Sequence, residues 1–119
     1  RHHRIAEGVR KAVIEGWGLE LCAQNEYWYS NTVTAVVVPE GKDAKQVLST
    51  AFNKYHISLG AGLTQVAGKV FRIGHLGDLN ELQAAAFVVG AEMSMIDSGI
   101  DVKPGSGIGA ASEYWRKNL

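Results

Sequence analysis

Apolar residues recur every three or four positions in four stretches of the chain, which is the spacing of a buried helix face. The first stretch ends at Trp17, and Gly18 follows where a helix end favours a left-handed residue. Asp43 stands where it can cap the second helix. The four stripes are Ile5, Val9, Ala12, Val13 and Trp17; Val47, Leu48, Ala51, Phe52 and Tyr55; Leu82, Ala85, Val89, Met93 and Ile96; and Ile108, Ala111 and Trp115. The sequence therefore predicts four helices.

The third helix is the longest, and its start is predicted at Asp78. Glu81 follows Asp78 at the spacing of a capping box, in which each side chain bonds to the other residue's backbone N–H group. Gly99 marks the end of this helix. Removing the Asp78 side chain is then expected to cost about 1 kcal/mol of stability.

Extended segments separate the predicted helices. The run Thr32 to Val38 is rich in β-branched residues, and Val70 to Ile73 alternates between two faces. Shorter extended pieces are expected at Leu19 to Cys22, at His56 to Leu59 and from Val102, with loops at Gln24 to Asn31 and at Gly60, Gly62 and Gly68. The predicted order is α, β, β, α, β, β, α, α. This order is typical of an α/β (α+β) two-layer sandwich, here one domain over residues 1–119, in which helices cover one face of a short, largely antiparallel sheet.

One arginine interrupts the apolar strand before the third helix. Alternation places Phe71 and Ile73 on one face and Val70 and Arg72 on the other, so the guanidinium group leaves the sheet opposite the core if Phe71 and Ile73 are buried. Arg72 is therefore a candidate binding group for a carboxylate, whose geometry matches the donors of guanidinium. On pattern alone, a surface arginine paired with an Asp or Glu is the favoured alternative.

The amino-acid composition limits the kinds of molecule that the chain is expected to bind. Lys plus Arg and Asp plus Glu both number 12, so the chain has no global basic field for nucleic acid or an anionic membrane. The single cysteine, Cys22, cannot form an internal disulfide and is expected to be a small buried hydrophobe. With no apolar run of membrane-spanning length and no secretory signal, the expected location is cytoplasmic.

The sequence contains no complete motif of a known catalytic, nucleotide-binding or metal site. The run Gly105 to Ala110 fits G-x-G-x-x-A but has no long strand before it, so it is interpreted as the turn into the last helix. Gly62 to Lys69 misses the P-loop spacing by one residue. The four histidines (His2, His3, His56 and His75) have no metal-ligand pattern; a structural hydrogen bond is favoured for His75, with a substrate contact as the minor alternative. No catalytic residue and no metal site are predicted in this chain.

Two segments carry a resemblance to a known family. They are A-G-K-V-F-R-I-G-H-L-G-D-L-N-E, which contains Arg72, and G-I-D-V-K-P-G-S-G. With them, essentially the whole chain resembles the class V pyridoxal-phosphate aminotransferases, in the serine–glyoxylate and alanine–glyoxylate branch. The resemblance implies the small C-terminal domain of an aspartate-aminotransferase-like fold. It also implies that Arg72 binds the α-carboxylate of the amino or keto acid substrate.

The same resemblance implies what else the intact enzyme needs. The cofactor lysine would belong to a large domain upstream of Arg1, and the first helix, whose start has no cap, is consistent with a cut within a helix. Pyridoxal phosphate is expected in the intact enzyme and not on this chain, which alone should be inactive.

The implied reaction converts serine and glyoxylate to hydroxypyruvate and glycine, with alanine as a competing donor and a homodimer as the intact assembly. The alternative from another class is a free-standing module that binds or senses a small carboxylate without catalysis.

Overall fold

Four strands form one antiparallel sheet in the order β1-β2-β4-β3. The structure, a computed structural model, describes residues 2–22, 33–62, 66–75 and 80–118. The strands are β1 (Glu20–Leu21), β2 (Val33–Val37), β3 (Gly60–Ala61) and β4 (Val70–Gly74). Every neighbouring pair is antiparallel, which confirms the expected sheet. The polar loop expected at Gln24 to Asn31 lies outside the described residues.

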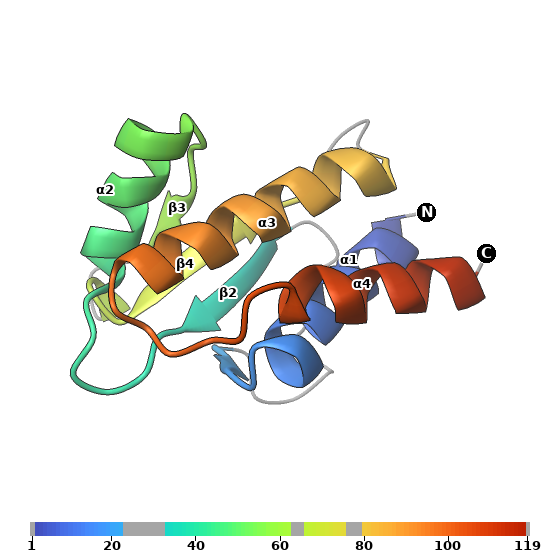
Figure 1. Cartoon of the computed structure of the whole chain (residues 1–119), viewed down its shortest axis with the longest axis horizontal. Coiled ribbons are helices and arrows are strands. Elements are labelled where there is room, and N and C mark those ends of the chain that lie inside the picture. Colours follow the sequence, from blue (N-terminus) through green and yellow to red (C-terminus); the bar gives the residue numbers. More distant parts are fainter. Residues whose placement is uncertain (1, 23–32, 63–65, 76–79, 119) are drawn as a thin grey trace.

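Helices form the second layer. They are α1 (His2–Lys11), a π-helical continuation η1 (Ala12–Gly16), α2 (Ala44–Tyr55), α3 (Glu81–Asp97) and α4 (Ser106–Lys117). Figure 1 shows α3 running across β2 and β4, with α1 and α4 side by side along one flank of it and α2 on the other. The two-layer sandwich and the element order are therefore confirmed, and the π-helical turn is an addition that the periodicity did not predict. No helix in the described ranges combines the length and apolarity needed to cross a bilayer.

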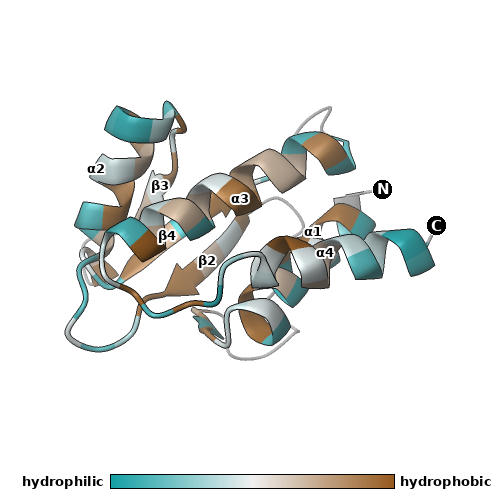
Figure 2. Cartoon of the chain, in the orientation of Figure 1, coloured by the Kyte–Doolittle hydropathy of each residue, from teal (hydrophilic) through white to brown (hydrophobic). Residues whose placement is uncertain are grey.

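The register of β2 and β4 decides which side chains enter the core. Thr34 is paired with Ile73, and Val36 with Phe71, and all four are buried on the face toward the helices. Figure 2 shows these two strands in the brown of apolar residues beneath α3. Because neighbours alternate along a strand, Arg72 points away from the helices, as expected.

The buried face of α3 differs from the predicted stripe. Leu82 is 80% exposed and Ile96 is 37% exposed, whereas the core receives Ala84, Val88, Ala91 and Met95. Close packing explains the difference, because Gly90 of α3 lies against Ile57, in the segment just after α2, and an added Cβ would lie 2.0 Å from Ile57 Cδ1. The small residues of this face let the neighbouring segments approach, and Leu82 and Ile96 turn outward.

Four smaller predictions were also wrong. Cys22 is exposed because the alternation that buries Leu21 turns the next side chain outward. Phe52 in α2 is 64% exposed. The extended piece expected at His56 to Leu59 is irregular, and the strand forms one residue later, as β3, in the segment assigned to a loop. Val102 is buried but forms no strand.

The start of α3 also lies later than predicted. Asn80 is the N-cap: its side chain accepts from Gln83 N at 2.9 Å, and Asn80 N donates to Gln83 Oε1 at 3.0 Å. This is a complete capping box, displaced by two residues because Asn and Gln serve as well as Asp and Glu. Asp78 lies outside the described residues, and Glu81 instead forms an ion pair with Arg4.

We therefore expect Asn80→Ala, and not Asp78→Ala, to destabilise the chain by about 1 kcal/mol. The physical reason is the loss of the side-chain acceptor for an otherwise unpaired N–H group in the first turn. Denaturant unfolding of both variants measures the effect. A larger loss for Asp78→Ala would place the start of the helix at the earlier residue.

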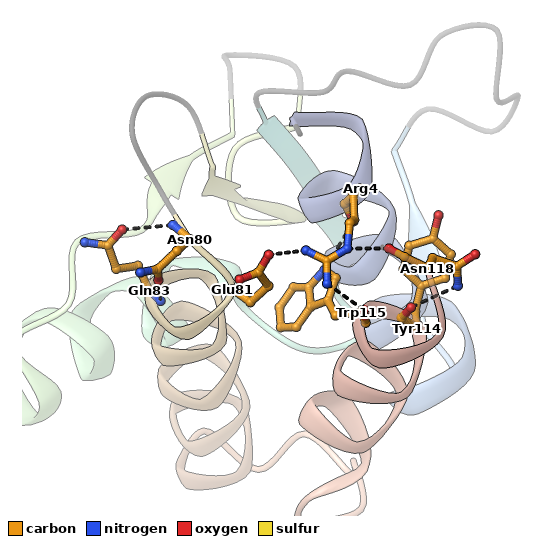
Figure 3. A network of polar contacts seen from close by, with 7 residues as sticks. All are labelled: Arg4, Asn80, Glu81, Gln83, Tyr114, Trp115 and Asn118. Carbon is orange, nitrogen blue, oxygen red and sulfur yellow. Dashed lines mark hydrogen bonds and ion pairs between the residues drawn. The ribbon is translucent and has the colours of Figure 1, made fainter.

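Arg4 joins the ends of three helices. Its guanidinium group donates to Glu81 of α3 and to the backbone carbonyls of Trp115 and Asn118 at the end of α4 (Figure 3). In return, Trp115 Nε1 donates to the Arg4 carbonyl at 3.2 Å. The tryptophan lies against Gly8, where an added Cβ would come within 2.1 Å of its Nε1 atom. Gly8 is therefore what allows α1 and α4 to pack closely.

A pH-dependent contact links α2 to α3. Asp97 accepts from Lys54 Nζ at 2.8 Å and Tyr55 Oη at 2.5 Å. The hydrogen bond from Lys54 and then that from Tyr55 lower the pKa of Asp97, while the hydrogen bond to Asp97 raises the pKa of Lys54. The carboxylate therefore stabilises the fold above its unfolded pKa of about 4 and loses that effect as pH falls through the lower folded pKa.

In Asp97→Asn, the free energy of unfolding should therefore fall less steeply than in the parent as the pH is lowered, because the variant has no carboxylate to protonate at this position. The contribution of Lys54 has the opposite window: it is present below its unfolded pKa of about 10.4 and is lost as pH rises through the raised folded pKa. Unfolding curves from pH 2 to 7, at a constant low salt concentration of about 0.01 M so that screening is weak, test the acid side. Identical pH profiles for the variant and the parent would contradict the assignment.

Candidate carboxylate-binding site

Arg72 lies at the centre of the sheet face that the helices leave open. It stands in β4 opposite Ala35 of β2 on one side and opposite Gly60 of β3 on the other. Both neighbours are small, so the long side chain has room above the sheet. The arginine is half-buried, which places its guanidinium group at the border between protein and solvent.

The guanidinium group is held by backbone. Arg72 Nε donates to the carbonyl oxygen of Ala61 at 2.9 Å. In the described part of the chain, no ion pair joins Arg72 to a carboxylate. The alternative of a surface arginine paired with an Asp or Glu is therefore not seen among these residues.

Among the residues that the structure describes, this arrangement leaves most of the donors of Arg72 available. Guanidinium carries five N–H groups, of which one is used by Ala61. Two of the others lie parallel along the edge formed by Nη1 and Nη2, which matches the two oxygens of one carboxylate. Chemically, the site can bind and orient a carboxylate, but it offers no proton because arginine stays charged.

His75 lies away from the open face. It is 1% exposed, and its Nε2 atom is 2.8 Å from Thr34 Oγ1, which belongs to the core face of β2. The structure therefore does not bring His75 and Arg72 together, although they are three residues apart. The contact joins the segment after β4 to β2 and helps fix the strand that carries Arg72.

The residues present do not fit the covalent attachment of pyridoxal phosphate. A Schiff-base lysine needs a desolvated amine, but six of the seven lysines are exposed and Lys11 is paired with Glu15, whose hydrogen bond raises the lysine pKa. Within the described ranges, no cluster of three or more His, Cys, Asp or Glu side chains could hold a metal ion.

Two surface pockets lie away from Arg72. One, of about 470 Å³, is an apolar groove between α3 and α4 with Leu82, Ile108 and Trp115 in its wall. The other, of about 380 Å³, surrounds the turn at Pro39 to Lys42. Arg72 lines neither of them, so the open sheet face is a separate surface.

The glycines near the C-terminus bind a carboxylate of the chain itself. Glu92 of α3 is 6% exposed; its Oε1 accepts from Trp17 Nε1 at 2.9 Å and Gly107 N at 3.0 Å, and its Oε2 accepts from Gly105 N at 2.7 Å. Gly105 has a positive φ of 84° at the start of α4, which confirms the turn interpretation of this motif. The sequence argument missed Glu92; a lone acid inside an apolar helix was the available signal.

Comparisons with known proteins agree on one group of relatives. The serine–glyoxylate aminotransferase of Methylorubrum extorquens is 55% identical over 118 residues, which are 99% of this chain and 29% of that protein. The L-aspartate–glyoxylate aminotransferase of Paracoccus denitrificans is 52% identical over 98% of this chain and 29% of its own length. No family model matches the sequence.

A solved structure gives the same result for the fold. The pyridoxamine–pyruvate aminotransferase from Mesorhizobium loti superposes with a TM-score of 0.87 at 28% identity, over 99% of this chain and 30% of that one. The chain thus spans somewhat less than a third of the length of the relatives it matches.

Proposed function

We propose, on the premise that this chain belongs to the class V aminotransferases, that it is the substrate-carboxylate-binding C-terminal domain of an enzyme that transfers the amino group of serine to glyoxylate. The observation that carries the proposal is Arg72, half-buried on the open sheet face with its Nη1–Nη2 edge available. Relatives named as serine–glyoxylate aminotransferases support the choice of substrates.

Orientation is the contribution of Arg72 in this proposal. Serine and glyoxylate both carry a carboxylate next to the reacting carbon, so one guanidinium group can bind the two substrates in turn. A bidentate pair fixes direction as well as distance, and holding a reactant in a productive geometry accelerates a reaction without any proton transfer by the binding group.

The rest of the enzyme completes the proposal. Because the lysines of this chain are exposed or ion-paired, the attachment of pyridoxal phosphate requires a lysine from a large domain, which we place upstream of residue 1. The homodimer implied by the resemblance and the cytoplasmic location expected from composition belong to the same proposal.

A comparison of amino donors tests the proposed reaction. The full-length enzyme that contains this chain is assayed with glyoxylate and with serine, alanine or aspartate; the last is included because an aspartate–glyoxylate relative is nearly as similar. We expect the highest kcat/KM with serine. Preference for another donor would change the assigned substrate, and no amino transfer with any of the three would support the free-standing carboxylate-binding module instead.

A further inference from the structure

We propose that β3 positions Arg72: the absence of a side chain at Gly60 and the carbonyl oxygen of Ala61 together determine where the guanidinium group lies. This inference rests on the proposed carboxylate-binding role of Arg72. It assigns a role in substrate specificity to two residues that make no contact with substrate themselves.

Gly60 allows an unusually close approach to Arg72. The two residues are direct partners across β3 and β4. A Cβ added at Gly60 would lie 3.1 Å from Arg72 Cβ, 3.2 Å from Nε and 3.5 Å from Nη2. Opposed Cβ atoms in antiparallel strands normally stand about 4.5 to 5.5 Å apart. Glycine lets the arginine side chain pass over this strand at its present distance, and an added Cβ would force its neighbours to shift by a few tenths of an ångström.

The next residue supplies the polar contact. Ala61 accepts from Arg72 Nε at 2.9 Å through its carbonyl oxygen, which belongs to the backbone and has no side-chain rotamers. A flexible arginine is thereby held at its Nε end, and the plane of the guanidinium group is set before a carboxylate arrives. The remaining parallel donors, on Nη1 and Nη2, then face one direction.

A single substitution should separate positioning from folding. Gly60→Ala is expected to push β3 and Arg72 apart, because the new Cβ cannot stay 3.1 Å from Arg72 Cβ. Gly74→Ala is the matched control, since Gly74 ends the same strand β4 and its added Cβ would meet nothing within 4 Å. Both variants, with Arg72→Ala, are made in the full-length enzyme.

The readout compares two amines that differ in the carboxylate. The half-reaction is measured with serine and with 2-aminoethanol, which is serine without its carboxylate. We expect Gly60→Ala to lower kcat/KM for serine by about 3- to 10-fold, less than the roughly 100-fold cost of a 1 Å misplacement, because the added Cβ shifts its neighbours by only a few tenths of an ångström. The rate with 2-aminoethanol should stay at its parental value, and Gly74→Ala should change neither rate.

Two outcomes would overturn the inference. Equal losses for both amines in Gly60→Ala would show general damage to the domain. An unchanged serine reaction in Gly60→Ala, beside a large loss in Arg72→Ala, would reject positioning by β3 while the proposed function stands. An unchanged serine reaction in Arg72→Ala would instead reject the proposed function itself.

A measurement on the unaltered chain covers the case in which Gly60→Ala does not fold. In the NMR spectrum of the 119-residue chain, the Arg72 Nε–H proton should exchange with water more slowly than that of Arg116, an exposed arginine at the end of α4. The Arg72→Lys variant identifies the signal by its loss. Equal exchange rates at Arg72 and Arg116 would refute the contact with Ala61.

Discussion

Arg72→Ala should lower kcat/KM for both serine and glyoxylate in the full-length enzyme. In the full-length enzyme we expect the large domain and the bound substrate to bury this half-exposed arginine, and truncating one partner of a buried, hydrogen-bonded charge pair costs about 2 to 5 kcal/mol, which corresponds to about 30- to 4,000-fold. The value of kcat/KM is expected to fall for both substrates, because each half-reaction presents a carboxylate to the same guanidinium group. Initial rates with each substrate varied separately measure the two effects.

Arg72→Lys should recover only part of the loss. An ammonium group restores the positive charge, but it has no parallel pair of donors and no Nε–H to bond with the Ala61 carbonyl. The content of bound pyridoxal phosphate should stay at the parental value in both variants, because nothing in the geometry directs Arg72 to a phosphate.

Arg116→Ala provides the matched control for a lost arginine away from the open sheet face, and it should leave both substrates unaffected. Near-parental kcat/KM in Arg72→Ala would reject the carboxylate-binding assignment. Loss of the cofactor with the fold intact would show that Arg72 serves the cofactor instead of the substrate.

The strand that carries Arg72 was predictable because its pattern is local. Four residues of alternation, Val70 to Ile73, are enough to separate the faces once Phe71 and Ile73 are buried, and the structure pairs them with Val36 and Thr34 as a core requires. The neighbouring strand was not predictable. Gly60 and Ala61 carry no alternating pattern, and they are extended because they pair with Arg72 and Phe71 of β4, which follow ten or more residues later in the chain.

The face of α3 was not predictable because the helix is apolar on more than one side. Leu82 and Ile96 form a stripe of larger side chains, and Ala84 and Val88 belong to a parallel stripe of smaller ones. Burial of area alone favours the larger set. The structure buries the smaller set because Ile57, in the segment just after α2, packs against Gly90 of α3, and that contact involves residues distant in sequence.

Glu92→Ala should destabilise the chain by several kcal/mol, a large part of the stability of a small domain, because each buried donor left without an acceptor costs about 1 to 3 kcal/mol. Its carboxylate joins three segments, since it accepts from Trp17 at the end of the first helix and from the two glycine amides at the start of α4. Removing it leaves buried N–H donors without an acceptor at a helix start, where a negative charge is also favoured. Denaturant unfolding of the 119-residue chain measures the loss.

Glu92→Gln separates the loss of an acceptor from the loss of volume. The amide oxygen can keep the donors from Trp17 and Gly107, but the NH2 group then faces Gly105 N, which lies 2.7 Å from the present Oε2. Two opposed donors should cost about 1 to 3 kcal/mol, less than the alanine variant. Glu113→Ala, at an exposed carboxylate of α4, is the control and should leave the free energy of unfolding close to its parental value. If Glu92→Ala and Glu113→Ala had equal effects, the buried carboxylate would not be what joins α3 to the start of α4.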